Sequence, residues 1–394
     1  MAIGALIGAY QEDDSGSLRA LLPLAGRTLI EYQVKCAAAG GAAPIVIMVE
    51  RVPQALQDAF ERLRLDGVGV FPVSDVNEAV TRFEAGSMIL LLGDGIVSSV
   101  DLVSSLAGEA DTAIATVPDD ERHEDFERID AHSRWAGVAV VDARLLGSTA
   151  AILGDWDLQS TLLRRAIQEG ARLVRAADQA SEPLLVQSAD ELADFQRHLI
   201  LASKGGRNDW TSRYLLPPIE DFATEHLMET PIWPSWLIWG ALALTLGGAI
   251  CFSRGWLGAG LVLLIISMPL DLIAGRLATI RLKPLPTRML SRLALWPAAG
   301  IALLAIGLWE TRHGTGWGSL VAAGSACAFA EAARIEKATM PPGGELWLFS
   351  RRNAIVLAVP FALAGVWTAY LLAALFYAAM SFFIVQRVRH HPSS

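Results

Sequence analysis

Cysteine is scarce in this chain of 394 residues, and the three that occur, Cys36, Cys251 and Cys327, lie far apart in the sequence. That spacing excludes a disulfide scaffold and a Cys-x-x-Cys metal or redox site. The apolar start has no basic n-region, so no signal peptide is predicted. The net charge of −9 also argues against a nucleic-acid partner, because an acidic surface repels phosphate.

Charge is unevenly distributed between the two halves of the sequence. Residues 1–232 carry 19 Lys and Arg against 36 Asp and Glu, which is a net charge of −17. Residues 233–394 carry 13 against 5, which is a net charge of +8. Because hydrophobic residues make up 53% of the chain, too many for a soluble enzyme, we expect the second half to lie in a membrane.

Long apolar runs recur from Trp233 onward. At about 20 residues per span, they predict four transmembrane helices, over 236–252, 255–275, 290–309 and 316–333. The run 354–386 contains Pro360 and Gly365, and it predicts either a short pair of helices or one long tilted helix. We therefore expect six transmembrane helices in all.

Lysine and arginine predict the orientation of these helices. They gather in the segments after the second and fourth spans, whereas the opposite loops carry one each, Arg254 and Arg312. We therefore expect the soluble half and both termini on the cytoplasmic side of an inner membrane, in a bacterial architecture.

Asp271 is the acidic residue at the end of the second span. A charge costs about 2.5–3.5 kcal/mol at the bilayer centre on insertion scales, so we expect this carboxylate to be compensated. One interpretation is a metal or substrate ligand facing a polar cavity. The other is a carboxylate that pairs with Arg276 or reaches the headgroups.

Residues 1–200 alternate short apolar runs with amphipathic stretches, which predicts an α/β domain with a parallel sheet covered on both faces. The runs are 3–9, 44–49, 67–73, 87–93 and 112–117. Asp94 follows the fourth run, at a strand end where ligands of such sheets collect, and it could coordinate a metal held by nucleotide phosphates. An ordinary turn or N-cap aspartate is the alternative.

The loop 15–19 follows the first predicted strand and contains Gly16 and Arg19. Small residues and a cation there could hold phosphates through backbone N–H groups. The alternative is a flexible loop, since the acidic residues 12–14 repel a triphosphate unless a metal intervenes.

The segment 208–229 has seven large apolar residues among charges and contains Pro217-Pro218. It predicts a pair of helices on the cytoplasmic leaflet, and a plain linker is the alternative. We therefore divide the chain into a soluble domain (1–205), an interfacial segment (206–232) and a transmembrane domain (233–394).

Three sequences in the soluble half resemble the sugar-phosphate nucleotidyltransferase family and its MobA-like relatives. They are Leu22-Pro23-Leu24-Ala25-Gly26-Arg27-Thr28-Leu29-Ile30, Gly93-Asp94-Gly95 and Trp135-Ala136-Gly137. The resemblance implies a doubly wound fold, a nucleoside triphosphate substrate and Mg²⁺. It also implies catalytic roles for Arg19 and Asp94, with Asp94 as the metal ligand, and cofactor contacts from Gly8, Gly16 and Gly137.

The second half resembles the CDP-alcohol phosphotransferase family in Arg213-Tyr214-Leu215, Thr230-Pro231-Ile232-Trp233-Pro234 and six expected spans with Asp271 in the second. The order of the two halves resembles the bifunctional inositol-1-phosphate cytidylyltransferases fused to CDP-inositol phosphotransferases. In those proteins the soluble domain makes a CDP-alcohol, and the membrane domain transfers its phospho-alcohol to a hydroxyl and releases CMP. The resemblance also implies a homodimer.

The nucleotidyltransferase motif is degenerate. The family has a Gly-rich loop followed by Pro-Lys, whereas this chain has Gly8-Ala9-Tyr10-Gln11 and then Leu18-Arg19. The family's second metal-binding acid falls in an Asp-x-Asp-Thr-Pro-Glu-Asp-Leu stretch, which reads Leu185-Val186-Gln187-Ser188-Ala189-Asp190-Glu191-Leu192 here. One of the two expected metal carboxylates is therefore missing.

The phosphotransferase motif, D-x2-D-G-x2-A-R-x8-9-G-x3-D-x3-D, is degenerate as well. Asp271, Gly275 and Ala278 remain, but Ala274 and Thr279 replace the second aspartate and the arginine, and residues 286–295 contain no acid. One carboxylate does not hold two divalent metals. The basic residues of this region favour a phosphate or an anionic lipid headgroup instead; they include Arg276, Arg281, Lys283 and Arg288.

The sequence therefore predicts a membrane-anchored nucleotidyltransferase-like protein of phospholipid or glycolipid headgroup synthesis whose membrane domain has lost its phosphotransferase chemistry. The alternative is a pseudoenzyme in both halves, which binds a nucleotide, an anionic headgroup or a partner enzyme. Whether the soluble half is an active transferase stays open at this point.

Overall fold

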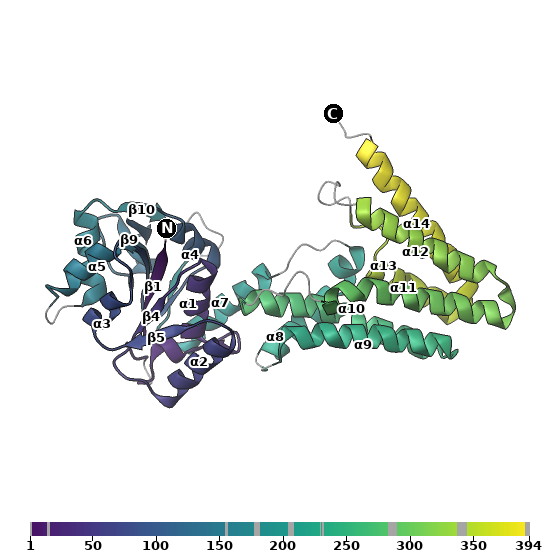
Figure 1. Ribbon diagram of the computed structural model, residues 1–394, viewed down its shortest axis with the longest axis horizontal. Coiled ribbons are helices and arrows are strands. Elements are labelled where there is room, and N and C mark those ends of the chain that lie inside the picture. The colour runs from purple at the N-terminus through teal and green to yellow at the C-terminus, as the bar shows by residue number, and fades with distance from the viewer. Residues whose placement is uncertain are drawn as a thin grey trace. The chain divides into compact units, whose positions relative to one another are not determined.

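The computed structural model describes residues 2–13, 16–153, 157–176, 182–203, 209–228, 230, 232–282, 290–336 and 345–390. The chain divides into two compact units, Met1–Leu199 and Ile200–Ser394 (Figure 1). The segment expected to be interfacial therefore groups with the helical second unit.

The first unit contains a seven-stranded sheet with the order β10-β8-β9-β6-β1-β4-β5. Its strands are β1 (Ile3–Gly8), β4 (Ile45–Met48), β5 (Val70–Val73), β6 (Met88–Leu92), β8 (Ala113–Pro118), β9 (Ser133–Asp142) and β10 (Arg172–Arg175). The five predicted strands are all present. β9 runs antiparallel to both β6 and β8, so the sheet is mixed, whereas a parallel one was expected.

Helices cover both faces of this sheet, as the sequence predicted (Figure 1). One face packs against α3 (Val76–Thr81), α5 (Ala143–Ala150) and α6 (Leu158–Gln168). The helices α1 (Leu29–Ala39) and α4 (Val100–Ala107) lie on the opposite face in Figure 1. The remaining elements of the unit are η1 (Arg19–Leu21), β2 (Pro23–Leu24), β3 (Arg27–Thr28), α2 (Gln54–Leu65), β7 (Ile96–Val97), η2 (Glu121–His123), β11 (Leu184–Leu185) and α7 (Ala189–Ala202).

The second unit is helical. Its elements are η4 (Thr211–Leu215), α8 (Pro217–Met228), α9 (Pro234–Ser253), α10 (Leu257–Ile280), α11 (Leu290–Glu310), η5 (Thr311–Thr315), α12 (Gly318–Glu336), α13 (Arg351–Ala364) and α14 (Trp367–His390). The run 354–386 thus forms two helices, which separate at Gly365, a residue with a φ of +69°.

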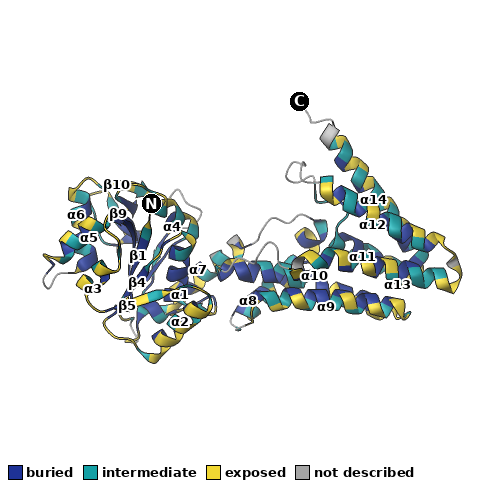
Figure 2. Cartoon of the chain, viewed as in Figure 1, coloured by how far each residue is buried: buried dark blue, intermediate teal, exposed yellow. Residues whose placement is uncertain are grey.

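Six spans were expected, and four described segments are long and apolar enough to cross a membrane: Pro234–Ser253, Leu257–Ile280, Leu293–Gly314 and Trp367–Val388. The helices α12 and α13 are not among these four. Apolar side chains also face outward from these helices, among them Trp236, Ile266 and Phe376, which are at least half exposed. Figure 2 shows exposed and buried residues alternating along these helices. An outer surface of this kind suits a lipid solvent, and the chain is a membrane protein.

Candidate functional site

Asp94 lies at the point where the strand order of the sheet reverses. From β1 the chain proceeds to β4 and β5 on one side and then returns to β6 on the other. Ligands of open α/β sheets bind beyond the carboxyl ends of the strands at such a point. Asp94 follows β6, and Tyr10 and Gln11 follow β1, so the fold brings these three residues together.

The carboxylate of Asp94 is held by backbone amides. Its Oδ2 atom accepts hydrogen bonds from the N–H groups of Tyr10 at 2.6 Å and Gln11 at 2.7 Å. The side chain is 4% exposed, and its Oδ1 atom has no hydrogen-bond partner among the described residues. Burial raises the pKa of Asp94, against the opposing effect of the two amides and of the positive charge of Arg19.

Glycines allow the close approach of backbone at this site. A Cβ atom at Gly8 would lie 2.9 Å from Nε2 of Gln159 and 3.2 Å from the backbone N of Asp94. Gly137 has a φ of +79°, and a Cβ atom there would overlap the side chain of Ile96. The two glycines therefore have packing roles, and their expected contacts with a cofactor stay predictions.

Arg19 lies beside the Asp94 turn, since a Cβ atom at Gly95 would lie 3.3 Å from its Cδ atom, but its guanidinium donates to other acceptors. Nη1 donates to Oε1 of Gln11 at 2.8 Å, and Nε donates to the carbonyl of Glu12 at 3.1 Å. Gly16 is the turn residue of this loop, and its carbonyl accepts a hydrogen bond from Arg51. A phosphate would have to compete with these acceptors for Arg19.

The helix α1 holds the Asp94 turn through two side chains that follow the motif 22–30 in the sequence. Gln33 on α1 donates from Nε2 to the carbonyls of Gly93 at 2.9 Å and Ile96 at 2.8 Å. Tyr32 donates to the carbonyl of Ser98. The helix begins with a Thr-x-x-Glu capping box, because Glu31 accepts from the backbone N–H and the hydroxyl of Thr28.

Several residues of the site were not predicted from the sequence. The hydroxyl of Tyr10 donates to Asp157 at 3.3 Å, and Glu127 accepts from the hydroxyl of Ser160 at 2.9 Å. Burial raises the pKa of Tyr10, and the negative charges of Asp157 and Asp94 raise it further. The indole Nε1 atom of Trp135 is buried without a partner among the described residues. Trp135 lies in β9, within the motif noted above, and Ser160 lies in α6, whereas no motif of the sequence marks Tyr10, Glu127 or Asp157.

The stretch that aligns with the family's second metal-binding acid lies next to the Asp94 turn. β11 pairs with β7, and the N–H of Val186 donates to the carbonyl of Gly95 at 2.8 Å. Gln187, with a neutral amide side chain, follows at once.

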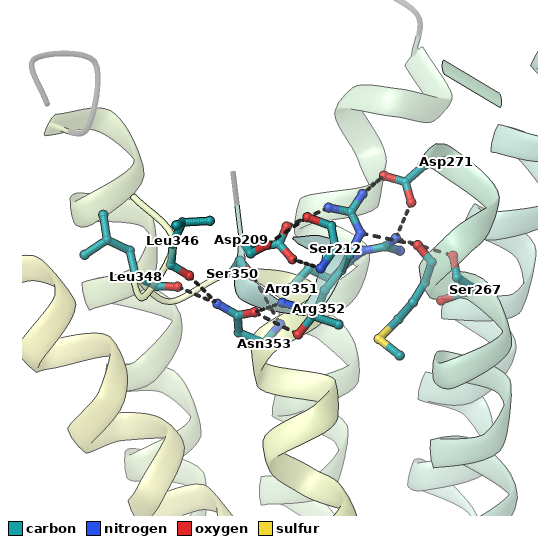
Figure 3. A network of polar contacts seen from close by, with 12 residues as sticks. Asp209, Ser212, Ser267, Asp271, Leu346, Leu348, Ser350, Arg351, Arg352 and Asn353 are labelled. Carbon is teal, nitrogen blue, oxygen red and sulfur yellow. Dashed lines mark hydrogen bonds and ion pairs between the residues drawn. The ribbon is translucent and has the colours of Figure 1, made fainter. Parts of the chain in front are cut away.

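Asp271 in the membrane half lies between two arginines of α13 (Figure 3). Its Oδ1 atom accepts from Nη2 of Arg351 at 2.9 Å, and its Oδ2 atom accepts from Nη2 of Arg352 at 2.5 Å. The expected partner Arg276 does not contact it in this way. A residue five positions along a helix points about 140° away, whereas residues three or four positions apart share a face.

Asp209 completes a cluster of four charges, which we call the arginine–aspartate cluster: Asp209, Asp271, Arg351 and Arg352. Arg352 donates from Nη1 to Asp209 at 2.8 Å (Figure 3). The four side chains are 5–23% exposed and together are electrically neutral. Both arginines occupy the first turn of α13, where the helix dipole is unfavourable for cations, so the two carboxylates compensate them.

Four basic residues were expected to bind a lipid headgroup, and the structure describes two of them, Arg276 and Arg281. Both contact acceptors of the protein itself. Arg276 is 4% exposed and pairs with Asp221 at 2.7 Å. Arg281 is 8% exposed and donates to the carbonyls of Leu227, Met228 and Thr230, at the end of α8. Lys283 and Arg288 lie outside the described residues.

The ligand sets for Mg²⁺ differ between the two halves. No group of three or more His, Cys, Asp or Glu side chains that could hold a metal occurs in the part of the chain that the structure describes. Asp94 offers one oxygen, Oδ1, which fits only an ion whose other ligands are phosphates and water. Asp271 does not fit an ion, because both of its oxygens accept from arginine.

The fold and these sites define a membrane protein with an α/β domain and a helical domain. No family model matches the chain, and no curated protein matches it. Among solved structures, it is similar to a nucleotidyl transferase from Methanothermobacter thermautotroptrophicus, at 18% identity and a TM-score of 0.38. That match covers 51% of this chain and 99% of the other. A likeness at this level assigns no activity.

Proposed function

We propose that this chain is a membrane-anchored nucleotidyltransferase-like protein that serves phospholipid or glycolipid headgroup synthesis without phosphotransfer chemistry in its membrane half. The observation that carries the proposal is the occupation of both Asp271 oxygens by Arg351 and Arg352. Two-metal phosphotransfer needs carboxylates that face cations. In this cluster the guanidinium groups take the place of metal charges.

The soluble half retains features of a binding site for a nucleotide. Oδ1 of Asp94 is a buried acceptor and Nε1 of Trp135 a buried donor, and neither has a partner among the described residues. Buried polar atoms without partners are uncommon and destabilising. Both residues adjoin Gly93, since a Cβ atom there would lie 3.1 Å from the Trp135 ring. A ligand that carries a donor would satisfy Oδ1 of Asp94.

A second candidate is a pseudoenzyme in both halves, which binds a nucleotide or a partner enzyme as a scaffold. Two observations favour it. Gln187 stands where the second metal-binding acid belongs, and Arg19 donates to Gln11 and Glu12. The cytoplasmic orientation, the homodimer and the Mg²⁺ requirement remain proposals in either case.

A rescue experiment separates these functions. Lipids of a strain that lacks the protein are profiled by mass spectrometry, with rescue by wild type, Asp94→Asn, Asp271→Asn and the double variant Asp271→Asn/Arg351→Gln. Asp101→Asn, an exposed acid on α4, is the control. We expect the double variant to restore the missing lipid, because its cluster is again neutral.

The outcome for Asp94→Asn distinguishes the two candidates. Failure at normal protein abundance indicates a catalytic carboxylate in the soluble half, whereas rescue indicates binding alone. If the double variant accumulates normally and still fails to restore the lipid, Asp271 has a chemical role and the proposal for the membrane half is wrong.

A further inference from the structure

A cavity of about 420 Å³ lies among α10 to α14 of the helical unit. One face of α11 lines it, with Leu293, Trp296, Gly300, Leu303 and Ile306 at helical spacing. These residues span 13 positions, which at 1.5 Å per residue is roughly 20 Å. The cavity is therefore elongated, and it follows α11 for nearly four turns.

The polar groups of the cavity gather around one end. α12 contributes Glu331 and Arg334 in its last two turns, and α13 contributes Arg351 in its first. Nε1 of Trp296 donates to Glu331 at 2.7 Å, and Arg334 lies over the Trp296 ring at 5.9 Å from its centroid. The hydroxyl of Tyr370 donates to the carbonyl of Ala354 in the first turn of α13, and the lining of the other end, near Ile306, is apolar.

An elongated apolar cavity with a polar mouth matches the shape of an amphiphile. Its volume falls within the roughly 300–1,000 Å³ of ligand sites. An empty apolar cavity of this size destabilises a fold, because the lining side chains lose packing contacts. A hydrocarbon chain restores those contacts, and the surrounding helices lie in a medium that supplies such chains.

The mouth favours an anionic headgroup. Arg334 is 55% exposed and pairs with Glu331, which is 41% exposed. An exposed ion pair contributes only about 0–1 kcal/mol, so a phosphate can displace Glu331 from the guanidinium at little cost. Arginine binds phosphate through two parallel N–H donors.

We propose that this cavity binds one acyl chain of an anionic phospholipid, with the phosphate at Arg334. The proposal goes beyond the nucleotide and headgroup role proposed above and does not depend on it. The site differs from the basic residues singled out in the sequence, because Arg276 and Arg281 are buried, whereas the side chain of Arg334 is 55% exposed.

The first test uses the wild-type full-length protein in nanodiscs that contain phosphatidylglycerol with a diazirine on one acyl chain. After illumination, we expect adducts on cavity residues of α11 and α12, such as Leu303 and Ala330. Adducts confined to outward-facing residues, such as Ile266 and Phe376, would overturn the proposal.

The second test compares matched variants by native mass spectrometry of retained phosphatidylglycerol. Ala330→Phe fills the cavity, whereas Val321→Phe adds the same ring at an exposed position of the same helix. We expect Ala330→Phe to retain at least fivefold less lipid than wild type, and Val321→Phe to retain as much lipid as wild type. Equal retention by the two variants contradicts an occupied cavity.

The headgroup assignment is tested separately. We expect Arg334→Gln to lower the preference for phosphatidylglycerol over phosphatidylethanolamine at least threefold, and Arg254→Gln, an exposed arginine elsewhere, to leave it unchanged. If wild type retains the two lipids equally, the anionic assignment is overturned.

Discussion

Arg351 on α13 donates from Nη2 to Oδ1 of Asp271 on α10 at 2.9 Å, and 80 residues of sequence separate the two. The contact joins the start of one helix to the end of an apolar span. It gives the acidic residue at membrane depth a counter-charge from the protein itself. The same contact occupies an oxygen that a metal ion would need.

Asp271→Asn is predicted to destabilise the helical unit. The change leaves Arg351 and Arg352 with Asp209 as their remaining carboxylate, and an unpaired buried charge costs up to about 3–5 kcal/mol. The cost is smaller here because Asp271 is 23% exposed. Thermal unfolding of the detergent-solubilised protein measures it as a lower Tm.

The double variant Asp271→Asn/Arg351→Gln should recover most of this loss, since coupled residues have non-additive effects. Glu331→Gln is the control, because its exposed pair with Arg334 contributes about 0–1 kcal/mol. A Tm for Asp271→Asn equal to that of wild type would show that the cluster has no structural role.

Arg281→Gln is predicted to loosen the end of α8. Arg281 donates to the carbonyls of Leu227 and Met228 in the last turn of α8 and to that of Thr230 just beyond it. Carbonyls in the last turn of a helix have no donors within the helix. Hydrogen exchange of peptides from 217–228 should become faster, with α9 unchanged. Arg312→Gln, an exposed arginine, is the control, and equal exchange in both variants contradicts the role assigned to Arg281.

Asp94→Asn is predicted to stabilise the first unit at neutral pH. Burial raises the pKa of Asp94 above its value in the unfolded chain, so folding favours the protonated carboxyl. This contribution is fully present below the unfolded pKa and is lost as pH rises through the folded pKa. The gain in free energy of unfolding of Asp94→Asn over wild type should therefore shrink as pH falls. Urea unfolding with pulse proteolysis measures this gain. A gain in stability that does not change with pH would contradict the raised pKa of Asp94 in the folded chain.

Glu31→Gln is predicted to have the opposite pH dependence. Burial alone would raise the pKa of Glu31, but hydrogen bonds from Arg62 and Thr28 outweigh it and lower the pKa. Glu31 therefore stabilises the fold above the unfolded pKa, and this is lost as pH falls through the folded pKa. The variant should lose about 3–5 kcal/mol near neutral pH and less in acid.

Glu61→Gln, an exposed glutamate on α2, is the control for Glu31→Gln in the same urea assay. A loss for Glu31→Gln that stays constant down to pH 3 would show that the charge of Glu31 is not the stabilising feature.

Much of the fold could be predicted because apolar periodicity is local. The five predicted strands and four of the six predicted spans follow from runs of a few residues to a few turns. The direction of β9 could not be predicted in this way, since it depends on pairing with β6 across a long stretch of chain. Gly137 in its interior also interrupts the apolar pattern that marks a strand.

Only the candidate site at the ends of strands could be predicted, because the order of the strands determines which residues lie close together there. The proximity of Asp94 to the residues after β1 follows from the sheet order. The pairing of Asp271 with Arg351 was not predictable, because in the sequence Arg351 and Arg352 look like ordinary basic residues of a loop beside a span. A signal was present, however: two adjacent arginines in the first turn of an apolar helix require carboxylates from elsewhere.

The most direct test of the central claim is a count of bound Mn²⁺ by electron paramagnetic resonance on the full-length protein. Wild type is compared with the neutral double variant Asp271→Asn/Arg351→Gln, after both are shown to be folded. We predict the same number of bound ions, because Asp271 binds arginine and no metal. One ion fewer in the double variant would contradict the account and return a metal-dependent chemistry to the membrane half.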